Sequence, residues 1–219
     1  MNVLYAIICF IFSKYMETFF QIILLVMSVV VHEVSHGYAA YLLGDPTAKS
    51  QGRLTLNPLK HLDLWGSIII PVFLVITRAG FLFGWAKPVP YNPYNLRNQR
   101  WGEAIVAGAG PASNIIIALF FGFLIRFAGG AGLLSTEFVS ISAVLVLMNL
   151  MLAIFNLVPI PPLDGSKILF SILPYHLQRF RAVFESYGFF IVLIFIFFFA
   201  NFLSPVVGFF FSLITGIGF

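Results

Sequence analysis

The stretch TFFQIILLVMSVVVHEVSHGYAAYLL, residues 18–43, decides how this chain folds. It is long enough to cross about 30 Å of hydrocarbon, which takes roughly 20 helical residues. It also contains His32, Glu33 and His36. Ionisable residues inside an apolar helix are costly unless they pair, bind a metal or face water. We therefore expect a membrane-spanning helix that carries a chemical function.

The composition of the whole chain agrees with a membrane protein. Of its 219 residues, 60% are hydrophobic and 9% are charged, with a mean hydropathy of +1.00. A soluble domain carries about 25% charged residues. Three further stretches, at about 103–128, 138–160 and 187–217, are apolar and long enough to span a bilayer. We expect one domain over 1–219, an all-α membrane bundle of about four to six transmembrane helices.

A weaker apolar stretch, residues 65–83, is interrupted by Pro71 and Arg78. Basic residues occur on both of its flanks, which favours the same side of the membrane for both ends. The stretch GWAKPVPYNPYN follows at 84–95, and its three prolines are incompatible with a continuous helix. We expect a re-entrant or β-hairpin-like segment near 65–95.

The twelve Lys and Arg residues give the chain a formal charge of +4. They form no stripe of the kind that binds nucleic acid, but lie in the breaks between apolar stretches. Cytoplasmic loops of membrane proteins show this distribution. The loops 44–64, 84–102 and 161–186 are therefore expected in the cytoplasm, and 129–137, which has no Lys or Arg, on the other side. The expected surroundings are a lipid bilayer, with no nucleic-acid partner.

The N-terminal region gives two further indications. Cys9 is the single cysteine, so no internal disulfide and no cysteine-rich metal site can form. Residues 1–12 are apolar but lack a basic start and a small-residue cleavage site. We expect a retained membrane or interfacial segment instead of a signal peptide.

The pentapeptide HEVSH, residues 32–36, is the strongest chemical signal. On a helix, positions i and i+4 project from the same face, so His32 and His36 can bind one metal ion. Glu33 lies beside the first of them, where a carboxylate can take a proton from a water on that metal. Catalytic zinc usually has three protein ligands and an open position for water.

The third ligand must come from another part of the chain. Asp164 is favoured because it follows NLVPIPPL at 156–163, where three prolines stop a helix next to a cavity. The alternative for Asp164 is an ordinary N-cap of a helix at 166–173. The other candidates, which lie in loops or near predicted helix ends, are His61, His176, Glu137, Asp63 and Glu185.

A run of small residues, GAGPASN at 108–114, lies inside another apolar stretch. Small residues allow helices to pack closely, but the amide of Asn114 needs a polar partner in lipid. Asn114 and Asn156 are candidates to donate hydrogen bonds to a substrate carbonyl or its oxyanion. Asn149 is a third candidate for this role, but a hydrogen bond between helices explains it equally well.

Together, HEVSH at 32–36, GPASN at 110–114 and NLVPIPPLDG at 156–165 resemble the site-2 protease family of intramembrane zinc metalloproteases. GWAKPVPYNP at 84–93 is similar to a stretch in compact bacterial members of that family, which have no PDZ or nucleotide-sensing domain. The resemblance implies one zinc ion per chain, with His32, His36 and Asp164 as its ligands and Glu33 as the general base. It also implies that Asn156 and Asn114 hold the substrate or the transition state.

The function expected from this resemblance is cleavage of a transmembrane or membrane-adjacent peptide bond by zinc-activated water. The location implied is the cell membrane of a prokaryote, with the site toward the cytoplasm. A helical substrate hides its carbonyls in its own hydrogen bonds, so it must unwind. Residues 84–93 are expected to pair with the unwound strand by β-addition.

Two other classes of protein place His and Asp in membranes. A metal transporter or channel usually needs ligands at several depths, whereas here they gather in one constellation. A non-proteolytic zinc-binding protein usually holds its metal with four protein ligands. The Glu beside the first His favours a protease over both.

Overall fold

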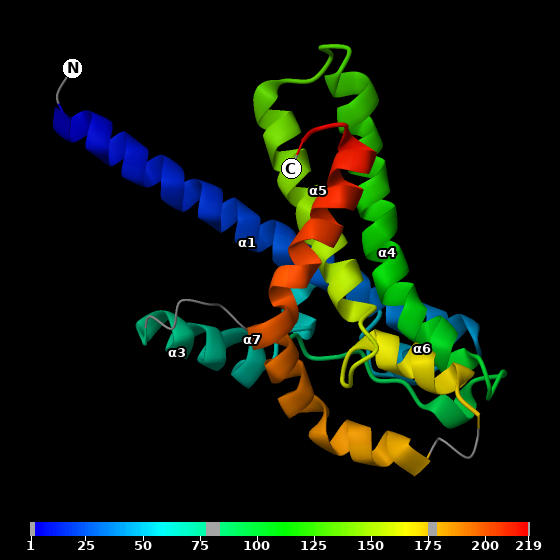
Figure 1. The fold of residues 1–219 in the computed structure, drawn as a ribbon. Helices are drawn as coiled ribbons and strands as arrows, with labels where there is room; N and C mark the ends of the chain where they lie inside the picture. The colour runs from blue at the N-terminus through cyan, green and yellow to red at the C-terminus, as the bar shows by residue number, and fades with distance from the viewer. Residues whose placement is uncertain (1–2, 78–83, 175–178, 219) are drawn as a thin grey trace.

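The computed structural model describes residues 3–77, 84–174 and 179–218, and within these ranges it contains helices and no strand. Four long helices form the frame: α1 (Val3–Leu42), α4 (Gly102–Leu124), α5 (Thr136–Asn156) and α7 (Arg179–Thr215). The turn η4 (Ile125–Gly129) extends α4. Figure 1 shows α4 and α5 standing side by side, with α7 crossing in front of α5.

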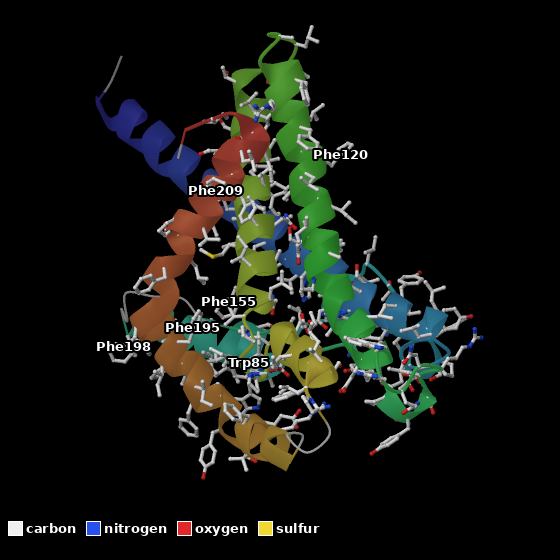
Figure 2. All side chains as sticks on the ribbon, turned by 45° about the vertical axis from the view of Figure 1, so that its right-hand side comes forward. Trp85, Phe120, Phe155, Phe195, Phe198 and Phe209 are labelled. Atoms are coloured by element: carbon white, nitrogen blue, oxygen red, sulfur yellow. The ribbon has the colours of Figure 1, made fainter. Side chains whose placement is uncertain are left out.

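Within the described ranges, four segments are long and apolar enough to cross a membrane. They are Phe19–Leu42 of α1, Gly102–Gly129 of α4 and η4, Thr136–Asn156 of α5 and Arg181–Phe198 of α7. This confirms the expected helical membrane bundle. Large apolar side chains cover its outer surface: Figure 2 labels Phe120, Phe198 and Phe209, each of which is more than 60% exposed. Lipid is the natural partner for such a surface.

The helix α1 begins well before its membrane-spanning part. Its N-terminal half projects away from the other helices, and its C-terminal half packs against α4 (Figure 1). The expected apolar segment at 1–12 is, from Val3 onward, a continuation of this helix.

The helix α4 is the centre of the bundle and packs against α1, α5, α6 (Asp164–Ile172) and α7. Because lipid is as apolar as a leucine side chain, close packing holds such helices together. At Gly122 of α4, an added Cβ atom would lie 2.3 Å from a methyl carbon of Ile214 in α7. Buried apolar residues surround this contact: Ala118, Ile125, Val146, Leu150, Val207 and Phe211.

The helix α5 ends at Asn156, four residues earlier than the apolar stretch 138–160 suggested. The prolines that follow it lack the N–H groups needed to continue a helix. The chain turns through residues 157–163 and enters α6 at Asp164. Gly165 makes this turn possible, since an added Cβ atom would lie 2.2 Å from the carbonyl oxygen of Leu157.

The region near 65–95 combines a short apolar helix with an extended segment. The helix consists of η2 (Leu64–Ile69) and α3 (Ile70–Ile76), and residues 78–83 lie outside the described ranges. Residues 84–92 are extended and run back beside η2, where the N–H of Trp85 donates to Gly66 O at 3.2 Å. This arrangement is hairpin-like, without a β-ladder in the part that is described. Entry and exit of 65–83 on one side of the membrane stays a prediction.

Three short helices lie in the remaining connections. The connecting helices are α2 (Thr47–Ser50), η1 (Pro58–Lys60) and η3 (Pro93–Asn95).

Although Pro205 lies inside α7, the helix continues past it to Thr215, and Figure 1 shows that α7 is bent. The chain therefore forms one curved helix over this stretch.

Candidate metal centre

Two helices bring together the side chains of His32, His36 and Asp164. The two histidines lie one turn apart on the same face of α1, and Asp164 is the first residue of α6. All three are buried. The imidazole rings meet edge to face, with centroids 4.7 Å apart.

Three potential ligand atoms form a nearly equilateral triangle. His32 Nε2 lies 3.1 Å from His36 Nε2 and 3.1 Å from Asp164 Oδ2, and His36 Nε2 lies 3.2 Å from the same oxygen. Around a tetrahedral zinc ion with bonds of about 2.0–2.1 Å, neighbouring ligand atoms are about 3.3 Å apart. The triangle therefore has the size that a zinc ion requires.

The other nitrogen of each imidazole faces an oxygen atom. His36 Nδ1 lies 2.7 Å from Val106 O, and since a carbonyl oxygen can only accept, Nδ1 carries the proton. His32 Nδ1 lies 2.6 Å from Asn114 Oδ1. With protons on both Nδ1 atoms, the two Nε2 lone pairs and the carboxylate oxygen all point into one small space. Three electron-pair donors this close together are favourable only around a cation. Histidines that bind zinc commonly have their other ring nitrogen held by a hydrogen bond, as both do here.

Gly110 of α4 forms the wall of this space. An added Cβ atom there would lie 2.5 Å from His36 Nε2 and 2.6 Å from His32 Nε2. Any larger residue would displace the imidazoles. The glycine in this position therefore lets α4 approach the two histidines closely.

The position of Asp164 excludes the N-cap alternative. The N-cap residue of α6 is Leu163, and no side chain caps this end of the helix. Asp164 directs Oδ2 at the histidines, while Oδ1 lies 3.9 Å from Lys167 Nζ, one turn further along α6. The carboxylate is therefore turned toward the imidazole pair.

Glu33 lies next to this triangle on α1 and is not part of it. Its Oε2 accepts a hydrogen bond of 2.9 Å from the backbone N–H of Val89, in the extended segment 84–92. Unlike its neighbours, Glu33 is only partly buried. A partly exposed carboxylate beside a metal site can exchange protons with water.

The sequence matches the family model described as "Peptidase family M50" over residues 20–139 and 125–199. These two ranges cover most of the chain and include all three residues of the triangle.

The chain belongs to peptidase family M50, the site-2 protease family.

Two curated bacterial proteins are similar to this M50 protease. "Putative zinc metalloprotease YwhC" of Bacillus subtilis (strain 168) is 42% identical over 180 residues, which are 80% of this chain and 78% of the relative. "Putative zinc metalloprotease Rip2" of Mycolicibacterium smegmatis is 34% identical over 169 residues, 77% of this chain and 62% of the relative. No solved structure gives a significant match.

Family membership settles the class of enzyme and its cofactor. The protein is a zinc metalloprotease, and the four apolar spans among its described residues, together with the family, indicate an integral membrane protein. The triangle of His32, His36 and Asp164 fits zinc by its donor types, its size and the orientation of its imidazoles.

The alternative ligand candidates that the structure describes make other contacts or are exposed. The imidazole of His61 donates to a backbone carbonyl at 2.9 Å, and Asp63 accepts a backbone N–H at 2.7 Å as the N-cap of η2. Glu137 is exposed at the start of α5, and Glu185 pairs with an arginine on α7 at 2.7 Å. His176 lies outside the described residues.

The three asparagines lie in different surroundings. Asn114 is fully buried behind His32, and its amide nitrogen donates to Asn149 Oδ1 at 2.8 Å. Asn156, at the end of α5, donates to Leu152 O of its own helix at 2.9 Å. The substrate-binding roles expected for Asn114 and Asn156 stay predictions. The contacts that the structure gives Asn114 are with the His32 imidazole and with the Asn149 amide.

Sequence reasoning did not identify two backbone groups next to the site. The N–H of Val89 and the carbonyl of Val106 are backbone groups, which no residue pattern marks. Asn149 was already a candidate in the sequence, and the structure shows the hydrogen bond between helices that was one of its two alternatives. Its partner, Asn114, could not be named from the sequence.

Proposed function

We propose that this M50 protease hydrolyses a transmembrane or membrane-adjacent peptide bond of other membrane proteins. The observation that carries the proposal is the position of the triangle: His32 and His36 lie inside the apolar span Phe19–Leu42. A substrate that reaches them must itself enter the membrane or lie at its surface. A metal path for transport would need further ligand groups, and the described residues contain one such cluster.

In the proposed reaction, His32, His36 and Asp164 would hold the zinc ion. When bound there, it would supply Lewis acidity for the attacking water and for the substrate carbonyl. The Glu33 carboxylate takes the proton from the attacking water and returns it to the leaving amine. The Val89 N–H holds Oε2 of this carboxylate, so Oε1 is the oxygen left to face the water.

We place the site nearer the cytoplasmic end of the bundle. His36 contacts Val106, which lies in the second turn of α4, and α6 starts at Asp164, so the site is close to the ends of these helices. The connecting segments next to these helix ends carry the following basic residues: Lys49, Arg53, Lys60, Lys87, Arg97, Arg100 and Lys167. The positive-inside rule assigns such an end to the cytoplasm. We propose the cell membrane of a prokaryote as the location.

The extended segment 84–93 remains our candidate for holding the unwound substrate. Several of its N–H groups already have partners: that of Lys87 donates to His61 O and that of Val89 donates to Glu33. Prolines provide no others. β-Addition is therefore limited to a few backbone bonds, such as one to the N–H of Tyr91. Proline or charge substitutions along 84–93 that leave cleavage unchanged would remove this part of the proposal.

The proposal is tested by cleavage of a tagged transmembrane substrate in liposomes. Wild type is compared with Glu33→Gln, with and without a chelator, and zinc content is measured in parallel. Because Gln keeps the size of Glu and an oxygen for the Val89 N–H, the variant should retain zinc. Its cleavage rate should fall by about 10²–10⁴, the usual contribution of a general base. Cleavage that survives either the chelator or the substitution contradicts the proposal.

A further inference from the structure

A chain of hydrogen bonds leads from His32 through the interior of the bundle. His32 Nδ1 lies 2.6 Å from Asn114 Oδ1, and Asn114 Nδ2 lies 2.8 Å from Asn149 Oδ1. Asn149 Nδ2 then lies 2.9 Å from Leu145 O of the same helix and 3.0 Å from Ser28 Oγ. Three helices, α1, α4 and α5, contribute to this chain.

The backbone carbonyl at the end of the chain gives it a direction. A carbonyl oxygen can only accept, so the NH₂ group of Asn149 must face Leu145. The planar amide then turns Oδ1 of Asn149 toward Asn114. That oxygen fixes the NH₂ group of Asn114 in turn, and Oδ1 of Asn114 faces His32. His32 therefore carries its proton on Nδ1 and directs the lone pair of Nε2 into the triangle.

We propose that Asn149 is a positioning residue of the zinc site. It acts through Asn114, whose amide it orients, and thereby sets the tautomer of His32. This inference rests on the proposed function, in which His32 is a zinc ligand. Asn149 itself does not reach the triangle.

Burial makes this orientation energetically significant. Asn114 and Asn149 have no exposed surface, so water cannot satisfy an amide that turns the wrong way. A flipped Asn114 would direct its NH₂ group at the His32 proton and leave both donors unpaired. An unpaired buried donor costs about 1–3 kcal/mol. Without Asn149, the free energies of the two orientations of the Asn114 amide differ much less.

The alternative is that Asn149 only joins two helices. The hydrogen bond from Asn149 to Ser28 connects α5 with α1 without any effect on the orientation of Asn114. Such a role predicts a change in stability alone. The positioning role predicts a change in the metal site of a protein that is still folded.

The experiment uses the full chain in detergent, with Asn149→Leu as the test variant. Leucine has a similar volume and removes the acceptor that Asn114 needs. The control is Val146→Ala, a cavity one turn away on α5 in the fully buried core. For each protein, zinc affinity is measured by competition with a chelator, and the absorption spectrum of bound Co²⁺ is recorded. Helical circular dichroism identifies variants that remain folded.

We expect Asn149→Leu to bind zinc about 10–100-fold more weakly, as for other partners of metal-binding histidines. Its Co²⁺ spectrum should differ from that of wild type. Val146→Ala should melt at a lower temperature and keep both metal properties. If Asn149→Leu does not fold, Asn149→Ala carries the same expectation.

A folded Asn149 variant with wild-type affinity and spectrum overturns the positioning role and leaves the proposed function intact. Equal weakening in Val146→Ala also overturns it, because the effect would then follow from any defect in α5. A wild-type protein that binds no zinc overturns both this inference and the proposed function.

Discussion

The backbone N–H of Val89 donates to Glu33 Oε2 over 2.9 Å, which joins the extended segment 84–92 to α1 beside the metal centre. The segment is held on each side of this contact. Arg53 Nη2 donates to Lys87 O at 2.9 Å, and Asp45 Oδ2 accepts the N–H of Asn92 at 2.7 Å. The position of Val89 is therefore fixed from two directions, and with it the orientation of the Glu33 carboxylate.

Replacement of Val89 by proline should reduce catalysis without loss of zinc. The substitution removes the one N–H that holds Glu33 Oε2. Hydrogen bonds to charged groups contribute about 1.5–3 kcal/mol, so we expect kcat to fall by about 10–100-fold. Zinc content should equal that of wild type, since the lost hydrogen bond is to Glu33 and not to a residue of the triangle. The measurement is steady-state cleavage with zinc analysis of the same sample.

The matched control is Val89→Ala, which keeps the N–H and removes most of the side chain. Val89 is buried against α1, where an added Cβ atom on Gly37 would lie 2.8 Å from it. Alanine should therefore lower stability more than kcat. If both variants lose the same activity, packing and not the hydrogen bond accounts for the effect.

Asp45 anchors the same segment and should do so in a pH-dependent way. Its carboxylate accepts bonds from Thr47, Asn95 and Asn92. Burial alone raises the pKa of Asp45, but these hydrogen bonds outweigh it and hold the pKa below its usual value. Asp45→Asn turns an NH₂ group toward one of these donors, so we expect a loss of about 1–2 kcal/mol at pH 7.

The sign of the pH effect follows from the lowered pKa. The unfolded chain takes up a proton on Asp45 near pH 3.9, before the folded protein does, so the stabilisation is complete above that pH. It is lost as the pH falls through the lower pKa of the folded state. The difference in melting temperature between wild type and Asp45→Asn should therefore shrink below about pH 4. The measurement uses zinc-free protein, and a difference that stays constant down to pH 3 contradicts it.

The sequence predicted that His32, His36 and Asp164 lie together and that four long apolar stretches form helices, and the described residues show both. Two histidines four residues apart identify one face of a helix whatever surrounds them. Asp164 was identifiable because the prolines before it end α5 and force the chain to turn. These features depend on local rules of helix geometry.

The remaining features depend on contacts between distant segments. The hydrogen bond from Val89 to Glu33 spans 56 residues and that from Asn114 to Asn149 spans 35. A backbone N–H is present at nearly every position, so the sequence cannot indicate which one meets a carboxylate. The orientation of a buried amide also depends on its neighbours in space. Both contacts required the packing of α1, α4 and α5 to be known.

Gly110→Ala should abolish zinc binding, whereas Gly108→Ala should not. The added methyl group at position 110 would lie 2.5 Å from His36 Nε2 and 2.6 Å from His32 Nε2. At position 108, on the same helix, an added Cβ atom would have no neighbour within 4 Å other than its own stretch of α4. Alanine also favours helix by about 1 kcal/mol relative to glycine, so neither variant should lose helical content. Zinc binding and circular dichroism together test this pair, and zinc retained in Gly110→Ala would show that the imidazoles can move aside.

Asp164→Ala should reduce zinc affinity more than about 100-fold, beyond the usual effect of a group that only supports a ligand. Its carboxylate is the one acidic group within the triangle, 3.1 Å from His32 Nε2 and 3.2 Å from His36 Nε2. Glu137→Ala is the control, because this carboxylate was an alternative ligand in the sequence and is exposed at the start of α5. It should bind zinc as wild type does. Competition with a chelator gives both affinities, and an unchanged value for Asp164→Ala would assign the third ligand to another residue.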